Sequence, residues 1–150
     1  MAIAPVGVLY GRSPDIGMDY AACQKFWRIA GVDHLHVNGL RNKFCEDDAS
    51  VIRSARTCLT PLFDQPGPAF TVMPVFSSAQ SADQVADTYA AIGTTDLIYC
   101  CGGGIMAHPH GPTAGVESLR EGWSAARAGI AADEYARDRP ALAAALEAFR

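Results

Sequence analysis

The sequence has no cluster of basic residues. Its 12 Lys and Arg side chains are scattered along the chain, and 16 Asp and Glu side chains bring the formal net charge to -4. Proteins that bind nucleic acid through electrostatics need a basic patch or stripe. We therefore expect no nucleic-acid partner.

Long apolar runs and paired cysteines are also missing. No uninterrupted apolar segment approaches the length that crosses a bilayer, and the first residues, Met1 to Pro5, lack the features of a secretory signal. The five cysteines are odd in number and contain no C-x-x-C pair, which favours reduced thiols over a disulfide framework. These absences predict a cytoplasmic domain without a membrane partner.

What the sequence does contain is enough apolar material, 49% of 150 residues, for one domain with a sizeable core. Helical and extended patterns alternate along it, with no internal repeat. We predict strands over 34–39, 70–76 and 96–101, with a weaker candidate over 3–10. We predict helices over 19–31, 50–63, 81–92, about 113–126, near Asp133, and over 140–149.

Repeated strand–helix units with almost wholly apolar strands are typical of a parallel β/α fold. An eight-stranded barrel of this kind needs about 250 residues, and the chain has 150. The pattern leaves two architectures open, a small open sheet or part of a barrel whose remainder lies elsewhere.

A glycine triplet, Gly102 to Gly104, follows the last predicted strand. Glycines leave their backbone N–H groups uncovered, and such groups can form a concave nest for an anion, most often phosphate. A bare triplet is more typical of a flexible turn. Here the strand before it, and His108, Pro109 and a helix after it, favour the anion site.

Other polar groups follow the remaining predicted strands, at the end where β/α folds assemble their sites. Lys43 lies on a loop from which it could close over an anion or polarise a carbonyl oxygen, although a lone loop lysine is usually solvated surface. Ser77 and Ser78 lead into a helix N-terminus and can offer hydroxyls and amides to phosphate. Ordinary helix capping is the plain alternative.

Histidines offer a second chemistry. His34 and His36 point to the same side of their strand, and His36, nearer the strand end, is better placed to contact a substrate oxygen or phosphate. With His108 and His110 they also allow a zinc site of the hydrolase type, which the proline between the second pair disfavours. Cys101 has no His–carboxylate relay beside it, so burial is its favoured role.

Taken together, these segments resemble the RuBisCO large-chain family, in the C-terminal part of its barrel domain. The resemblance runs from about Gly11 to Phe149 and is carried by four ordered motifs, GVDHLH at 31–36, Lys43, MPVFSS at 73–78 and CGGGIMAHPHG at 101–111. It implies an α/β fold, the last three to four units of a (β/α)8 TIM barrel. Residues 1–150 would form this C-terminal part, with the N-terminal domain and early barrel strands absent.

The resemblance also implies residue roles. His36 resembles the histidine that contacts one substrate phosphate, and Ser77 the serine that binds substrate beside it. Lys43 resembles the mobile-loop lysine that stabilises developing charge, and Gly102 and Gly103 the backbone site for the other phosphate. Histidines 34 and 108 match family positions with a structural role.

The sequence also departs from the carboxylating members of the family. Their lysine lies in a Gly-Lys-Leu-Glu-type loop, whereas residues 42–46 read NKFCE, and Ala79 stands where members usually have glycine. These features are closer to the RuBisCO-like proteins (form IV). Nothing in the chain resembles the family's carbamylated lysine and Asp-Glu magnesium ligands, so we expect no metal ligands on it.

The leading interpretation is a segment of a RuBisCO-like enzyme that enolises, isomerises or decarboxylates a phosphorylated ketose derivative with Mg2+. Family members are homodimers or larger. Because the magnesium ligands are absent, we expect the isolated chain to be inactive. The alternatives are a fragment of a ribulose-bisphosphate carboxylase, a non-catalytic remnant or half barrel that folds only against its complement, and a zinc hydrolase.

Overall fold

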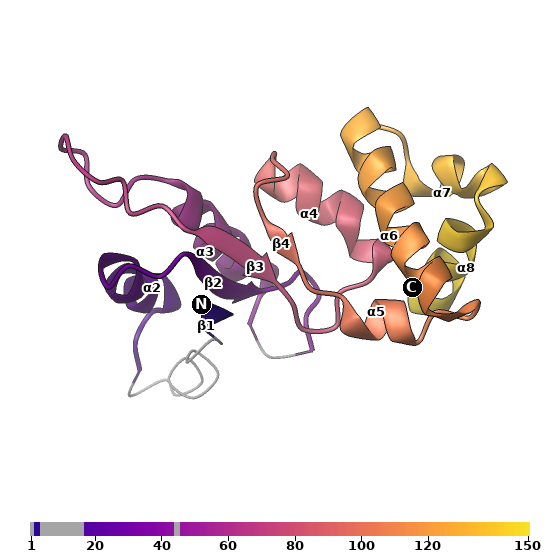
Figure 1. Cartoon of the computed structure of the whole chain (residues 1–150), viewed down its shortest axis with the longest axis horizontal. Coiled ribbons are helices and arrows are strands. Elements are labelled where there is room, and N and C mark those ends of the chain that lie inside the picture. Colours follow the sequence, from indigo (N-terminus) through magenta and orange to yellow (C-terminus); the bar gives the residue numbers. More distant parts are fainter. Residues whose placement is uncertain (1, 4–16, 44–45) are drawn as a thin grey trace. The chain divides into compact units, whose positions relative to one another are not determined.

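A computed structural model describes residues 2–3, 17–43 and 46–150 of the chain (Figure 1). The chain divides into two compact units, the first comprising Met1–Ser77 and Asp96–Tyr99, the second Ser78–Thr95 and Cys100–Arg150. The first unit contains the sheet and the second is helical. Each unit is described by itself below.

The sheet of the first unit is parallel, with its four strands in sequence order. The strands are β1 (Ala2–Ile3), β2 (His34–Asn38), β3 (Met73–Phe76) and β4 (Ile98–Tyr99). Neighbours in sequence are neighbours in the sheet, the order expected of successive β/α units. A register shift between His36 and Asn38 interrupts the β2–β3 pairing just where β2 ends.

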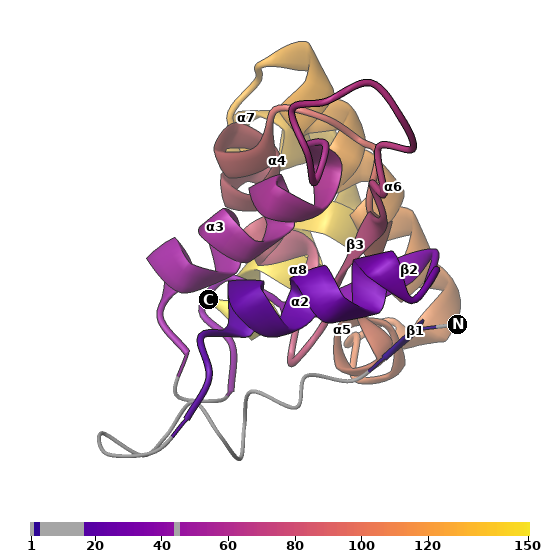
Figure 2. The same cartoon turned by 90° about the vertical axis from the view of Figure 1, so that its left-hand side faces the viewer.

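Two helices accompany these strands, α2 (Tyr20–Ile29) and α3 (Asp48–Leu59), and they pack against each other (Figure 2). Aspartates begin both helices. The side chain of Asp19 accepts a hydrogen bond from Ala22 N, and that of Asp47 accepts one from Ser50 N at 2.8 Å. Such N-caps satisfy amides that have no partner inside the helix.

The core of the first unit forms between the sheet and α3, which packs on β2 and β3. Apolar side chains from both sources are fully buried, among them Leu35, Val37, Val51, Ala55, Val75 and Phe76. Alternate residues of β2 are half-buried, so His34 and His36 lie on the opposite face from Leu35 and Val37. The burial pattern therefore confirms that the two histidines share one side of the strand.

The second unit is a helical cluster in which α6 (Gly111–Ala128) packs against α4 (Val85–Ile92), α5 (Gly102–Met106) and α8 (Pro140–Phe149). Shorter elements are η1 (Ala82–Gln84), α7 (Ala132–Tyr135) and η2 (Ala136–Asp138). Ser81 and Gln84 form a capping box, which confirms Ser81 as a helix start. The Glu121 carboxylate of α6 accepts the Leu142 amide in the first turn of α8 at 3.0 Å.

Several element boundaries differ from the sequence-based prediction. β3 begins at Met73 rather than at residue 70, because Phe70 adopts a φ of 49°, which no strand allows. The helix predicted over 50–63 is α3, from Asp48 to Leu59. Most of the candidate strand over 3–10 lies outside the described residues.

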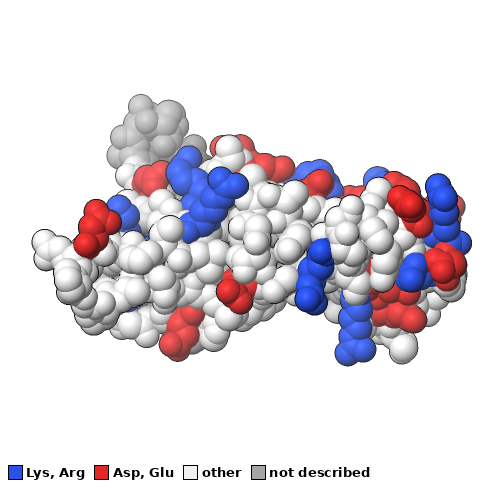
Figure 3. Space-filling view, turned by 90° about the horizontal axis from the view of Figure 1, so that it is seen from above, with Lys and Arg blue, Asp and Glu red and all other residues white. Residues whose placement is uncertain are grey.

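No helix of residues 2–3, 17–43 and 46–150 combines the length and apolar character needed to span a membrane. On the face shown in Figure 3, basic and acidic side chains are interspersed, without a broad field of either sign. This distribution agrees with the scattered charges of the sequence.

Candidate functional site

The ends of β2 and β3 bring His36 and Ser77 together. His36 Nδ1 lies 3.1 Å from Ser77 Oγ, within hydrogen-bond distance. One step further along, the Ser77 amide donates to the Asn38 carbonyl at 3.0 Å. The structure therefore places these two sequence-predicted residues side by side at the carboxyl end of the sheet.

The surroundings of His36 favour its neutral form. Burial lowers the pKa of its imidazole, because the charged form loses hydration there. The Tyr20 hydroxyl of α2 donates to the His36 carbonyl and so holds the backbone at this position. A neutral imidazole can hydrogen-bond a hydroxyl or a phosphate oxygen without needing a counter-charge.

This shift predicts a pH dependence of stability. The pKa of His36 is lower in the folded state than in the unfolded chain, where it is about 6.5, so the unfolded chain binds a proton first as the pH falls. The free energy of unfolding should therefore fall as the pH drops below about 6.5. Urea titrations should show a smaller loss in His36→Gln and an unchanged loss in His110→Gln, whose histidine is exposed. Equal losses in wild type and His36→Gln would contradict the assignment.

Lys43 lies on the loop that joins β2 to α3, in the same unit as His36 and Ser77. Its side chain is exposed. The loop around it carries hydrogen bonds that sequence reasoning missed, because the asparagines and the glutamate that make them look like ordinary loop residues. Asn42 Nδ2 donates to the carbonyls of Gly39 and Glu46, each at 3.0 Å.

Ser78, Gln80 and the glycine segment belong to the second unit. Ser78 and Ala79 both have φ near 70°, in the left-handed region. Glycine adopts this conformation most readily, which agrees with the glycine that the family resemblance implies at the position of Ala79. The following residues pack closely on α5, because a Cβ on Gly104 would lie 2.9 Å from the Gln80 carbonyl oxygen.

The glycine triplet lies in a short helix rather than in a flexible turn. β4 ends at Tyr99, and Gly102 to Met106 form the short helix α5. Gly102 and Gly103 are exposed in its first turn, where amides have no partner within a helix. A Cβ on either glycine would meet nothing within 4 Å, so packing does not explain why these two positions lack side chains.

At other positions close packing requires glycine, so substitutions at a packed and an unpacked glycine can be compared. A Cβ on Gly115 of α6 would lie 2.5 Å from the Ile105 carbonyl oxygen. Gly115→Ala should lower the free energy of unfolding by about 1–3 kcal/mol, because α5 and α6 must separate. Gly103→Ala should leave it unchanged or raise it by up to about 1 kcal/mol through better helix propensity. Thermal unfolding would measure both, and equal destabilisation by the two variants would refute the distinction.

The six sequence-predicted site residues thus fall into two groups. His36, Lys43 and Ser77 belong to the first unit, and Ser78, Gly102 and Gly103 to the second. In the first group, a direct contact joins His36 to Ser77. In the second group, the segment that begins at Ser78 packs on the glycine helix through Gln80 and Ser81.

His108 and Cys101 have surroundings typical of structural residues. His108 is buried, its Nε2 donates to the Ala141 carbonyl at 2.9 Å, and its Nδ1 accepts the His110 amide at 3.1 Å. It therefore ties the α5–α6 turn to α8. Burial raises the pKa of the Cys101 thiol to about 11, which disfavours the thiolate that a nucleophile needs.

No metal-binding group is assembled in the described part of the chain. Among residues 2–3, 17–43 and 46–150, no three His, Cys, Asp or Glu side chains lie where they could hold a metal ion. These residues therefore fit neither the Mg2+ that the family resemblance implies nor a zinc site built from the two histidine pairs.

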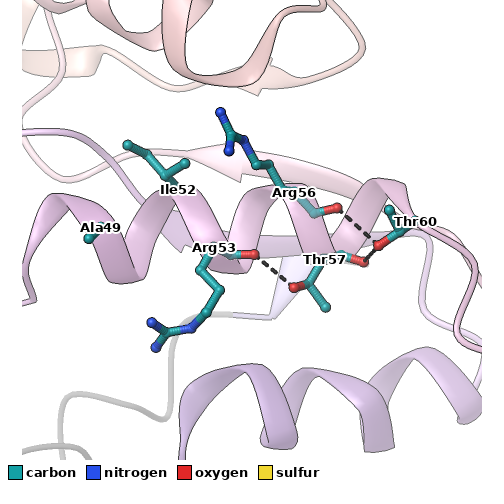
Figure 4. A pocket seen from close by; sticks show the side chains of 6 residues that line it. All are labelled: Ala49, Ile52, Arg53, Arg56, Thr57 and Thr60. Carbon is teal, nitrogen blue, oxygen red and sulfur yellow. Dashed lines mark hydrogen bonds between the residues drawn. The ribbon is translucent and has the colours of Figure 1, made fainter.

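A hollow on the first unit is lined by α3 and its C-cap, with Arg53, Arg56 and Thr57 among its residues (Figure 4). Hydrogen bonds within the helix, such as Thr57 Oγ1 to the Arg53 carbonyl at 2.8 Å, occupy its polar groups. None of the sequence-predicted site residues lines it. We assign it no role in the site.

Comparison with known proteins places these observations in a family. Residues 4–149 match the model of the ribulose bisphosphate carboxylase large chain, catalytic domain. The chain is 56% identical to the 3-oxo-isoapionate-4-phosphate transcarboxylase/hydrolase of Xanthobacter autotrophicus, over 96% of this chain and 34% of the relative. It is 47% identical to the 3-oxo-isoapionate-4-phosphate decarboxylase of Rhizobium rhizogenes, over 92% of this chain and 32% of the relative.

Solved structures agree with this match. A RuBisCO-like protein from Burkholderia fungorum superposes with a TM-score of 0.88 at 48% identity, over 94% of this chain and 34% of the other. The octameric RuBisCO of Pyrococcus horikoshii superposes with a TM-score of 0.81 at 28% identity, over 97% of this chain and 33% of the other. The described fold corresponds to the C-terminal part of their barrel domain. The chain spans about a third of the length of the curated relatives it matches.

Proposed function

Because this chain belongs to the RuBisCO large-chain family, we propose that it supplies the last part of the barrel of a RuBisCO-like enzyme acting on a phosphorylated ketose derivative. The observation that carries the proposal is the identity with the Xanthobacter autotrophicus enzyme, which extends over nearly the whole chain. The chain covers 34% of that relative's length, so we propose the activity for a complete barrel that includes this segment.

The names of the two curated relatives suggest the substrate class. Both act on 3-oxo-isoapionate 4-phosphate, a sugar acid phosphate whose name places a ketone beta to its carboxylate. We extend this class, a phosphorylated 3-oxo sugar acid, to the present protein. When the carboxylate of such a compound leaves as CO2, the electron pair of the broken bond moves onto the ketone oxygen and an enolate forms.

The family resemblance implies a role for each predicted residue toward such a substrate. The Lys43 ammonium would balance the charge that develops on the enolate oxygen. The Ser77 hydroxyl would hydrogen-bond the substrate, and the neutral His36 imidazole would hydrogen-bond its phosphate. The exposed amides of Gly102 and Gly103 would hold an anionic group, and Ser78 of the same unit would offer its hydroxyl.

The metal remains a proposal for the complete protein. The family resemblance implies Mg2+ in that protein, where the metal would supply Lewis-acid chemistry. The described residues of this chain do not fit a site for it, so no step is assigned to the metal here. We also propose a homodimer or larger assembly in the cytoplasm, supported by the octameric RuBisCO with which the chain superposes.

A chimera tests the proposal directly. This chain would replace the matching last third of the Rhizobium rhizogenes decarboxylase, and CO2 release from 3-oxo-isoapionate 4-phosphate would be measured. We expect turnover that EDTA abolishes and MgCl2 restores, and no carboxylation of ribulose bisphosphate. A folded chimera that is inactive beside an active parent would refute the proposal, and carboxylation would favour the carboxylase-fragment alternative.

Helix α2 favours a second candidate function. In this alternative the chain is a half barrel that depends on the complementary half of the barrel. This helix buries Gln24 and Arg28 while Phe26 and Ile29 remain 67% and 53% exposed. Large apolar side chains gathered on one exposed helix face mark an interaction surface. The part of the family fold that precedes this segment in the relatives is the partner that this face would contact.

This candidate predicts a binding defect. Phe26→Glu should weaken binding of the chain to the separately expressed first two-thirds of the Xanthobacter autotrophicus enzyme by at least about tenfold, because a charge must then be desolvated in the interface. Phe63→Glu, at another exposed aromatic residue of the same unit, should not weaken it. Calorimetry or analytical size exclusion would measure binding. Equal affinities of both variants and wild type would contradict a role for the α2 face.

A further inference from the structure

The loop that carries Lys43 is closed at its base by a set of hydrogen bonds centred on Glu46. Glu46 Oε2 accepts a hydrogen bond from the Asn38 side-chain amide, and Glu46 Oε1 accepts one from Ser50 Oγ at 2.9 Å. Asn38 is the last residue of β2, and Ser50 lies in the first turn of α3. One carboxylate therefore joins the end of the strand to the start of the next helix.

A second set of hydrogen bonds involves the residues just before Lys43. The Asn42 side-chain amide donates to the Glu46 carbonyl, four residues along the chain, and to the Gly39 carbonyl. The Arg41 amide donates to Asp48 Oδ1 at 2.7 Å. Arg41 and Asn42, which precede Lys43, are thus held to Asp48 and Glu46, which follow it.

The backbone supports this arrangement. Asn38 has a φ of 62° and Arg41 a φ of 47°, both in the left-handed region that side chains rarely adopt. Asparagine tolerates this region better than most residues. Arginine does not, and the bond from its amide to Asp48 is one of the contacts that hold it there. Contacts that override backbone preference in this way are typical of functional loops.

The same base also carries the His36–Ser77 pair. The Asn38 carbonyl accepts the Ser77 amide, while the Asn38 side chain binds Glu46. Asn38 is 2% exposed, so its hydrogen bonds compete little with water. Glu46 and Ser77 therefore contact the same buried residue from two directions.

We propose that Glu46 is a positioning residue that holds the Lys43 loop to the end of β2, through the contacts of Glu46 with Asn38, Asn42 and Ser50. This inference rests on the role proposed above for Lys43. Catalytic groups on loops are placed less precisely than groups on strands or helices unless supporting hydrogen bonds hold them. The Glu46 contacts supply that support before any substrate binds.

The chain allows a clean test, because Lys25 and Lys43 are its only lysines. Labelling with [15N]lysine gives two backbone amide signals, one from the loop and one from the exposed residue Lys25 of α2. In the unsubstituted chain we expect a rigid Lys43 amide, with an order parameter of about 0.85, and in Glu46→Ala a value below about 0.6. The Lys25 signal should stay unchanged and report that the fold persists.

The conservative variant separates position from charge. In Glu46→Gln the side-chain oxygen still accepts the Asn38 amide, and the new NH2 group donates to Ser50 Oγ. We expect the Lys43 order parameter of Glu46→Gln to match that of the unsubstituted chain. Asn42→Ala should loosen Lys43 as Glu46→Ala does. A Lys43 amide that is already flexible in the unsubstituted chain, or equally rigid in Glu46→Ala, would overturn the proposal.

Kinetics of the chimera test the catalytic consequence. Glu46→Ala should lower kcat by about ten- to a hundredfold through misplacement of Lys43, with little change in KM, and Glu46→Gln should restore most of it. An unchanged kcat in Glu46→Ala would refute the positioning role. If the proposed function is wrong, the unsubstituted chimera will be inactive. The Lys43 order parameters test the positioning role of Glu46 independently of that activity.

Discussion

Replacing Arg28 with alanine should lower the free energy of unfolding by about 3–5 kcal/mol, because the change removes buried hydrogen bonds and leaves a cavity. Arg28 is 1% exposed, and its guanidinium donates to three backbone carbonyls, those of Thr57, Thr60 and Phe70. Thr57 and Thr60 lie at the C-terminal end of α3, where carbonyls lack partners within the helix. Arg28 of α2 therefore caps α3.

The third bond explains a further part of the effect. Phe70 has a φ of 49°, an unfavourable conformation that the bond from Arg28 Nε, at 2.6 Å, helps to hold. Burial lowers the pKa of Arg28 from its ordinary value, which shows that the charge is kept there at some cost. The carbonyl contacts offset that cost, and an arginine fork can reach all three at once.

Two variants make the test specific. Arg28→Lys keeps the charge but has a single nitrogen, so it should recover only part of the lost stability. Phe26→Ala, at an exposed position of the same helix, should change the unfolding free energy by less than about 0.5 kcal/mol. Urea unfolding would measure all three. Full recovery by lysine would mean that charge, rather than the three directed bonds, stabilises the unit.

Replacing Lys43 with methionine should lower kcat of the chimera by about 10²–10³-fold, because one directed donor to a developing oxyanion contributes about that much. KM should change little, since the ammonium acts on charge that forms only in the transition state. Methionine keeps the length and apolar stem of the side chain. The effect would therefore come from the missing charge.

Lys25→Met is the matched control, because Lys25 is the other lysine of the chain and lies exposed on α2. It should leave both kinetic constants unchanged. A Lys43→Met chimera with normal kcat and a raised KM would assign Lys43 to substrate binding alone. That result would contradict the proposed stabilisation of the enolate.

The sequence was sufficient for the order of elements and for the position of the site residues along the chain. Buried strands read as apolar runs, helix starts as Asp19 and Ser81, and a helix stop as Gly31, which has a φ of 86°. These features are local, so neighbouring residues determine them. The four motifs also placed the chain in its family, which the family model confirms over residues 4–149.

Other features depend on contacts between distant segments, and the sequence did not reveal them. The glycine segment is a helix, because Gly104 and Gly115 allow it to pack against Gln80 and Ile105. Asn38 reads as the end of a strand and Glu46 as a loop residue until the fold brings their side chains together. Arg28 reads as a surface charge until α2 packs on α3 and buries it.

The sequence by itself therefore predicted which residues carry chemistry, since the types His36, Lys43 and Ser77 and their places near strand ends are local properties. Only the tertiary structure decided which residues support them. Hydrogen bonds from Asn38 to Glu46, from Ser77 to Asn38 and from Arg28 to α3 join residues that are far apart or that point together only once the strands pair. Their partners are set by backbone geometry at the strand ends, which no local pattern encodes.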